Sequence, residues 1–237
     1  MRCASRWAGL ADIGYIRGTF GTHPDAGSEQ LSIIHPIYKG AVAVSRRGLR
    51  FIDESVSYKI IGDACLQQPG GLAFQVFDQP IMDLSVPGVA TSDMRAGLED
   101  GRVIQAETLE DLAARCGIES APFLATMVRY NTDAPAGRDT LFGRDGLASH
   151  YGALRAITTA PFYAFPSTSS VLATYGGIAV DAAMRVRNAF GVPIAGLFAA
   201  GEVTGGLHGA AYMTGSSLGK SAIFGRIAGR SAASSMS

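Results

Sequence analysis

A glycine-rich segment near the C-terminal end carries residues that could hold a ligand. The apolar run from Leu197 leads into Gly201 and Glu202, and a loop then reaches Ser217 and Leu218 at the start of an apolar helix. Glycine suits positions where the backbone approaches a ligand or takes a positive φ. A helix start adds N–H groups without an intrahelical partner and the positive end of the helix dipole. The segment therefore predicts a cradle for an anionic or carbonyl-bearing ligand.

Composition and charge exclude several classes of protein. The 237 residues suffice for one large or two small domains, and 20 basic residues balance 20 acidic ones. We therefore expect neither a nucleic acid partner nor a membrane partner. The first residues lack the apolar core of a signal peptide, so we expect a cytoplasmic protein. The scattered cysteines, Cys3, Cys65 and Cys116, predict neither disulfides nor a metal site.

The remaining elements must position this segment. The pattern predicts a hairpin of strands 40–45 and 49–52, a strand over 72–77, and a helix over 108–117 with Thr108 as its N-cap. A helix should start at Ser120, and the last helix, 217–233, should bury Leu218 and Ile223. The chain then divides into a mixed α+β middle piece, roughly 36–158, and a flanking piece made of both ends.

Several motifs, in order along the chain, resemble those of one flavoprotein superfamily. They are Thr174-Tyr-Gly-Gly-Ile-Ala-Val-Asp181, Pro193 to Gly209 with its Ala-Ala-Gly-Glu202 step, Phe224 to Gly229, and upstream Lys39 to Glu54 and Gln68 to Asp78. This set resembles the FAD-binding flavoproteins of the fumarate reductase/succinate dehydrogenase type, a superfamily that includes the 3-ketosteroid dehydrogenases. The resemblance implies FAD as cofactor and an α/β fold.

The resemblance also implies a domain plan. Residues 1–35 would be a residual segment of an FAD-binding Rossmann-like domain, 36–158 an inserted capping domain of the α+β kind, and 159–237 the C-terminal part of the FAD domain. Such flavoproteins begin with a G-x-G-x-x-G unit, and this sequence contains none. We therefore expect an incomplete FAD domain that lacks the N-terminal ADP-binding half or receives it from a partner chain.

The resemblance assigns cofactor-binding roles to five residues. Glu202 matches the glutamate that bonds the ribityl/ribose region of FAD, although a solvated carboxylate at a strand end is the alternative. Gly215, Ser217 and Leu218 match the helix start whose amides meet the flavin N1–C2=O edge. Tyr175 precedes the glycine pair at which the backbone passes the isoalloxazine ring, or it simply packs there.

The expected catalytic positions depart from the fumarate reductase pattern. Ala173 replaces a histidine, and Tyr212 and Tyr58 each replace an arginine. These residues lack the cations that bind and protonate a dicarboxylate, so we expect a small neutral carbonyl compound as substrate. Tyrosine hydroxyls can polarise a ketone or relay a proton. Tyr58 and Tyr212 are therefore catalytic candidates, with buried packing rings as the alternative, and His23 is a candidate for contacting substrate.

Three functions stay open on this evidence. The first is part of an FAD-dependent dehydrogenase or reductase that moves a hydride between FAD and a carbon–carbon bond beside a carbonyl. The second is a binding module: a non-catalytic remnant, or a half that requires a partner chain. The third is a fumarate-type reductase with displaced catalytic groups.

Overall fold

The computed structural model describes residues 7–27, 32–148, 151–209, 213 and 215–235. The chain divides into two compact units, Gly18–Ser170 and Met1–Arg17 with Val171–Ser237. Strands β2 (Ile16–Thr22) and β6 (Phe162–Thr174) each run from one unit into the other. The domain limits expected from the sequence, after residues 35 and 158, stay a prediction, as does the cytoplasmic location. None of the described helices has both the length and the apolar character needed to cross a membrane.

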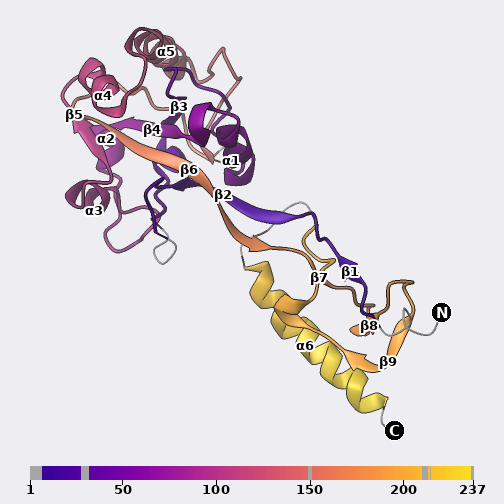
Figure 1. Cartoon of the computed structure of the whole chain (residues 1–237). Helices are drawn as coiled ribbons and strands as arrows, with labels where there is room; N and C mark the ends of the chain where they lie inside the picture. The colour runs from indigo at the N-terminus through magenta and orange to yellow at the C-terminus, as the bar shows by residue number, and fades with distance from the viewer. Residues whose placement is uncertain (1–6, 28–31, 149–150, 210–212, 214, 236–237) are drawn as a thin grey trace. The chain divides into compact units, whose positions relative to one another are not determined.

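The Gly18–Ser170 unit is built on one sheet (Figure 1). Its strands lie in the order β2, β6, β4 (Ala73–Asp78) and β3 (Val42–Ser45), and β5 (Ile104–Ala106) also pairs with β6. The β4–β6 pair is antiparallel, with Ala73 opposite Ser167 and Asp78 opposite Phe162. The strand predicted over 72–77 is confirmed as β4.

Eight helices of this unit lie within the described residues, and two of them were expected from the sequence. They are η2 (Pro36–Lys39), α1 (Tyr58–Leu66), η3 (Pro69–Gly71), α2 (Gln79–Met82), α3 (Met94–Glu99), α4 (Leu109–Cys116), α5 (Ser120–Asp133) and η4 (Ala134–Ala136). At α4 the Thr108 hydroxyl accepts a hydrogen bond from the Asp111 amide at 3.1 Å, and Gly117 ends the helix with φ 64°. Both α4 and the start of α5 at Ser120 are therefore confirmed.

Two hydrophobic clusters cover opposite faces of this sheet. Neighbouring residues of a strand point to opposite faces, and on β3 Ala43 belongs to one cluster while Val44 belongs to the other. Helix α1 packs on the Ala43 side through Ile61 and Cys65. Helices α3, α4 and α5 pack on the Val44 side. Groups carried by α1 and by α3 are thus separated by the sheet.

The other unit holds short strands and one long helix. It contains β1 (Leu10–Ala11), β7 (Gly177–Ile178), β8 (Arg185–Arg187), β9 (Pro193–Phe198), η6 (Gly201–Val203) and α6 (Ser216–Ser234). Antiparallel pairs join β1 to β7 and β8 to β9. Helix α6 lies along β9 and contacts η6 (Figure 1). Helices and strands are mixed in both units, which confirms the predicted α/β class.

Two sequence expectations are wrong in detail. Only the single bridge Val44–Arg50 forms where a second hairpin strand was expected over 49–52. The turn at Gly48 packs tightly on α5, since a Cβ there would lie 2.5 Å from the Phe123 nitrogen, and the chain then leaves the sheet.

The expected buried face of α6 is the second error. Leu218 is 80% exposed and Ile223 is 59% exposed, whereas Lys220 is buried. Strand β9 is also open, with Leu197 45% exposed. The physical reason is that Lys220 turns inward to bond the Thr204 carbonyl, so the most apolar residues of the helix have no cover among the described residues.

Candidate functional site

The start of α6 is open and has the backbone geometry of a ligand cradle. Gly215 is the N-cap and takes φ 89° and ψ −16°, a left-handed conformation that favours glycine. None of the described residues has an atom within 4 Å of a Cβ built on Gly215. The amides of Ser217 and Leu218 lie in the first turn, where a helix supplies no carbonyl partner. This turn can therefore meet an anionic or carbonyl edge.

The glycines of this region serve two different purposes. A Cβ on Gly205 would lie 2.4 Å from the Ala11 carbonyl oxygen, and one on Gly177 would lie 2.6 Å from the Gly205 nitrogen. These two glycines allow backbone segments to pack against each other. Among the described residues, by contrast, nothing comes within 4 Å of a Cβ on Gly209 or Gly219. Only the second kind leaves room for a ligand, a distinction that the sequence pattern does not reveal.

Aromatic and imidazole rings flank the helix start. The Tyr175 and His208 rings lie 5.2 Å apart between centroids with a 46° tilt. The His208 Nδ1 lies 3.5 Å from the Ser216 hydroxyl oxygen. Burial lowers the pKa of His208, and the positive charge of Lys220 lowers it further. His208 is therefore a neutral ring beside the cradle, and Tyr175 is buried against it.

Lys220 joins α6 to the residue that follows η6, and Glu202 lies within η6. The Lys220 ammonium donates a hydrogen bond to the Thr204 carbonyl oxygen, while its side chain is buried. Glu202 lies exposed in η6, after Gly201 with φ 77°. The predicted cofactor residues Tyr175, Glu202, Gly215, Ser217 and Leu218 thus all belong to this one unit. Tyr212 lies outside the described residues.

Tyr58 occupies the first position of α1 in the other unit. The Ser57 hydroxyl caps this helix by accepting from the Ile60 amide. Burial raises the pKa of the neighbouring Tyr38 to about 12, and the nearby Tyr58 adds to that rise. Tyr58 itself is half-buried. The structure therefore places a second phenol close to the predicted catalytic one.

A buried ionic cluster holds the segment that leads to Tyr58. Glu54 accepts hydrogen bonds from Arg50 Nε at 2.7 Å, from Arg144 Nη1 at 3.1 Å and from the Ala43 amide at 3.0 Å. Arg50 also pairs with Asp139 at 3.1 Å. All four charged side chains are buried. Sequence reasoning missed this cluster because Asp139 and Arg144 lie 89 and 90 positions from their partners Arg50 and Glu54, and no spacing rule connects residues so far apart.

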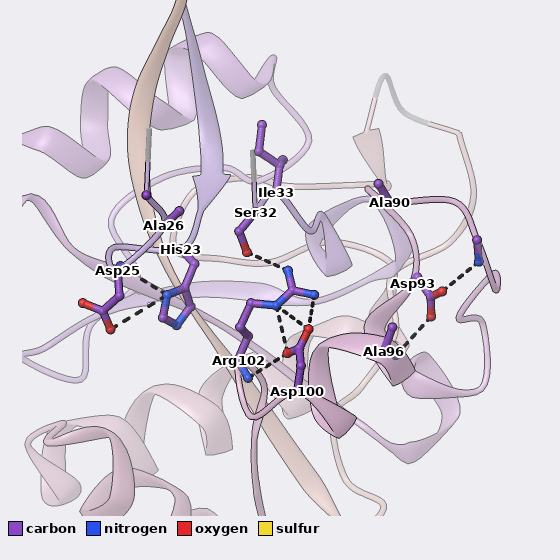
Figure 2. A pocket seen from close by; sticks show the side chains of 12 residues that line it. His23, Asp25, Ala26, Ser32, Ile33, Ala90, Asp93, Ala96, Asp100 and Arg102 are labelled. Atoms are coloured by element: carbon purple, nitrogen blue, oxygen red, sulfur yellow. Dashed lines mark hydrogen bonds and ion pairs between the residues drawn. The ribbon is translucent and has the colours of Figure 1, made fainter. Parts of the chain in front are cut away.

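His23 lines a separate cavity of about 550 Å³ (Figure 2). Its ring faces Asp25, with 4.0 Å between Nδ1 and the carboxylate. Across the cavity Arg102 donates to Asp100 at 2.7 Å and to the Ser32 hydroxyl at 2.6 Å (Figure 2). Burial is the main cause that lowers the pKa of His23. The cavity offers a neutral imidazole and a guanidinium to a polar ligand.

The structure does not bring His23 and Tyr58 into one cavity. His23 shares its cavity with Asp93 and Ala96, at the start of α3. Tyr58 starts α1, and α1 and α3 pack on opposite faces of the sheet. The catalytic roles expected for these two residues stay predictions.

Comparison with known proteins identifies the family. Residues 22–218 match the family described as "FAD binding domain". NADH:acrylate oxidoreductase of Vibrio harveyi is 34% identical over 198 residues, which cover 84% of this chain and 19% of the relative. 4-Oxocyclohexanecarboxylate 2-dehydrogenase of Sinomonas cyclohexanicum is 34% identical, over 70% of this chain and 31% of the relative.

The fold agrees with this sequence similarity. The open conformation of a flavocytochrome c3 fumarate reductase matches with a TM-score of 0.72 and 32% identity, over 97% of this chain and 38% of that one. The chain therefore spans only about a fifth to two fifths of the length of these proteins. Since the match covers most of its residues, the chain belongs to the FAD binding domain family, whose cofactor is FAD.

Proposed function

We propose that this chain is part of a flavin-dependent oxidoreductase and holds the isoalloxazine end of FAD at the start of α6. The observation that carries the proposal is the open first turn behind Gly215, in a chain that matches the FAD binding domain family. A turn closed by side chains would have argued against it. A glycine N-cap with free space suits the close approach of a flat ring.

The residues present fit the flavin end of the cofactor. The amides of Ser217 and Leu218 would hold the N1–C2=O edge, where the helix dipole stabilises negative charge. The exposed Glu202 would accept hydrogen bonds from ribityl or ribose hydroxyls. Tyr175, buried against His208, would support the ring side of the site. Bound FAD supplies a two-electron centre that exchanges hydride with a substrate.

We infer a neutral carbonyl compound as the substrate, with hydride leaving or entering at a neighbouring carbon–carbon bond. The relative named 4-oxocyclohexanecarboxylate 2-dehydrogenase supports the carbonyl group, while the neutral charge is inferred from the absence of cations at the positions of Ala173, Tyr58 and Tyr212. Tyr58 and Tyr212 stand where the fumarate reductase pattern has cations. The Tyr58 hydroxyl would hold or move a proton at the carbonyl or the carbon beside it. His23 lines a cavity that does not include Tyr58, so it takes no part in the site proposed here.

A partner-dependent half of a flavoprotein is the second candidate, and a specific observation favours it. Leu218 and Ile223 on α6 and Leu197 on β9 are exposed. Large apolar side chains exposed on neighbouring elements mark a surface that another part of a protein covers. An ADP-binding half, in the same chain or in a partner chain, would cover them and complete the FAD site.

Titration with FAD tests the proposal. Purified protein should quench flavin fluorescence and acquire a shifted flavin absorption band. Ser217→Asp keeps the helix start favourable, since carboxylates stabilise helix N-termini, but it should repel the flavin edge and weaken binding about tenfold. Ser234→Asp, at the far end of α6, is the control with the same charge change. A protein that leaves both flavin signals unchanged would support the non-catalytic remnant instead.

A further inference from the structure

Lys220 is an unusual buried residue. In a helix whose apolar side chains Leu218 and Ile223 are exposed, Lys220 is only 5% exposed. Its ammonium donates to the backbone carbonyl of Thr204, which follows η6. Lysine is almost never fully buried unless its charge is compensated. A buried lysine bonded to a neutral carbonyl is therefore a candidate for an electrostatic role.

The positive charge of Lys220 has no carboxylate partner in the described part of the chain. The ion pairs found there join other residues, and the partner of Lys220 is a neutral carbonyl. A buried cation without a counter-ion projects its potential onto neighbouring groups. One such group is His208, whose pKa is lowered first by burial and then by Lys220. The charge thus reaches the His208 ring, where the carboxylates of Glu202 and Asp12 act in the opposite direction, each with a smaller effect.

Lys220 also lies near the N-terminal end of α6, where its charge can act on a ligand bound at the helix start. It follows Leu218 by two residues, within the second turn of α6, so its charge adds to the positive end of the helix dipole. Dipole and ammonium together favour a bound group that gains negative charge. The reduced isoalloxazine ring is such a group, because hydride transfer delivers two electrons and one proton.

We propose that Lys220 raises the reduction potential of the bound flavin and so favours oxidation of the substrate. This inference rests on the proposed function. In the proposed oxidation the carbon beside the carbonyl would lose a proton, taken up through Tyr58, and the next carbon would lose a hydride to the flavin, so the substrate gains a double bond beside its carbonyl. The positive charge of Lys220 near the start of α6 would stabilise the negative charge of the reduced flavin. The chain would then act as a dehydrogenase rather than a reductase.

Three variants of Lys220 separate charge from packing. Lys220→Gln keeps a donor for the Thr204 carbonyl and removes the charge, Lys220→Arg keeps the charge, and Lys220→Met removes both. Arg230→Met removes a positive charge from an exposed site near the other end of α6 and is the matched control. Circular dichroism of each variant verifies that α6 and the fold are retained.

The potential of bound FAD, measured by dye equilibration, is the primary readout. Lys220→Gln should lower the equilibrium constant for two-electron reduction about tenfold, which corresponds to a potential about 30 mV lower. Lys220→Arg and Arg230→Met should leave the potential unchanged. Sulfite affinity of the oxidised flavin is the second readout, and Lys220→Gln and Lys220→Met should weaken it by a similar factor.

The outcomes distinguish this inference from the proposed function. If the unsubstituted protein binds no FAD, the proposed function fails and the inference fails with it. If it binds FAD but neither the potential nor the sulfite affinity responds to Lys220→Gln, the proposed function stands and the inference is overturned. An equal response to Arg230→Met would also overturn it, because the effect would then be one of net charge.

Discussion

Arg144 donates a hydrogen bond of 3.1 Å to Glu54, ninety positions away in the chain, and neither side chain is exposed to solvent. The contact fastens the loop after η4 to the segment that leads into α1. Because Glu54 also holds Arg50 and the Ala43 amide, one carboxylate joins β3, the turn after it and this loop. The position of Tyr58, four residues after Glu54, therefore depends on a buried ionic cluster.

Removing Arg144 should destabilise the Gly18–Ser170 unit. Arg144→Met leaves Glu54 buried with one cation fewer, and breaking a buried pair of this kind costs about 3–5 kcal/mol. Urea denaturation followed by circular dichroism measures the change. Arg138→Met, which removes an exposed arginine of the same loop, should change the unfolding free energy by no more than about 0.5 kcal/mol. Equal effects of the two substitutions would contradict the role of the cluster.

Tyr58→Phe should lower turnover without affecting flavin binding. Removing a positioned proton donor or acceptor typically costs about 10²- to 10⁴-fold in rate. The assay is dehydrogenation of a cyclic ketone with an artificial electron acceptor, and FAD affinity is measured on the same preparation. The control is Tyr151→Phe, which removes the hydroxyl of a tyrosine that is 82% exposed. Full activity of Tyr58→Phe would remove Tyr58 from the proposed site.

Alanine substitution of two glycines of α6 should stabilise the helix in both cases but weaken FAD binding in only one. Gly219→Ala and Gly229→Ala each place a methyl group in open space among the described residues, and each should stabilise the helix by about 0.5–1 kcal/mol. Only Gly219 adjoins the proposed flavin edge. Thermal unfolding should therefore improve for both variants, whereas FAD affinity should fall for Gly219→Ala alone. A matching affinity for the two variants would argue against cofactor contact at Gly219.

Local signals in the sequence predict much of the Gly18–Ser170 unit. Thr108 and Gly117 mark the ends of α4 because a side-chain cap and a left-handed glycine act within one turn of the helix. The apolar run over 72–77 predicts β4 for a similar reason, since strand propensity is local. Elements whose evidence lies within a few residues are therefore found without knowledge of the fold.

Contacts over long sequence distances cannot be predicted in this way. Glu54 and Arg144 look like ordinary surface charges in sequence, and their burial follows only from the packed loop. The amphipathic pattern of α6 correctly predicts a helix but places the wrong side inside, because Lys220 turns inward to the Thr204 carbonyl instead. Among the predicted site residues, the left-handed backbone and open surroundings of Gly215 are consistent with a ligand nearby. The roles of Gly215 and Tyr58 both stay predictions.

His35 should make stability depend on pH below about 6.5. Its ring is buried, and Nε2 donates to the Phe20 carbonyl oxygen at 2.8 Å in the neutral form. Burial lowers the pKa of His35, and the Phe20 bond only partly offsets this. The unfolded chain, with an ordinary histidine pKa of about 6.5, then binds more protons than the folded one. The free energy of unfolding must therefore fall as pH decreases below about 6.5, by at most about 1.4 kcal/mol per pH unit from one group.

His35→Gln isolates this contribution because glutamine keeps a donor for the Phe20 carbonyl but does not titrate. Urea unfolding at pH 7.5, 6.5 and 5.5 should show a smaller acid-induced loss for His35→Gln than for the unsubstituted protein. The aspartates with lowered pKa, such as Asp139, lose their charge only at more acidic pH and do not interfere in this window. His23→Gln is the comparison variant: burial also lowers the pKa of His23, but its ring is less buried, so its effect should have the same sign and be smaller. Parallel pH profiles for His35→Gln and the unsubstituted protein would show that His35 is not the titrating group.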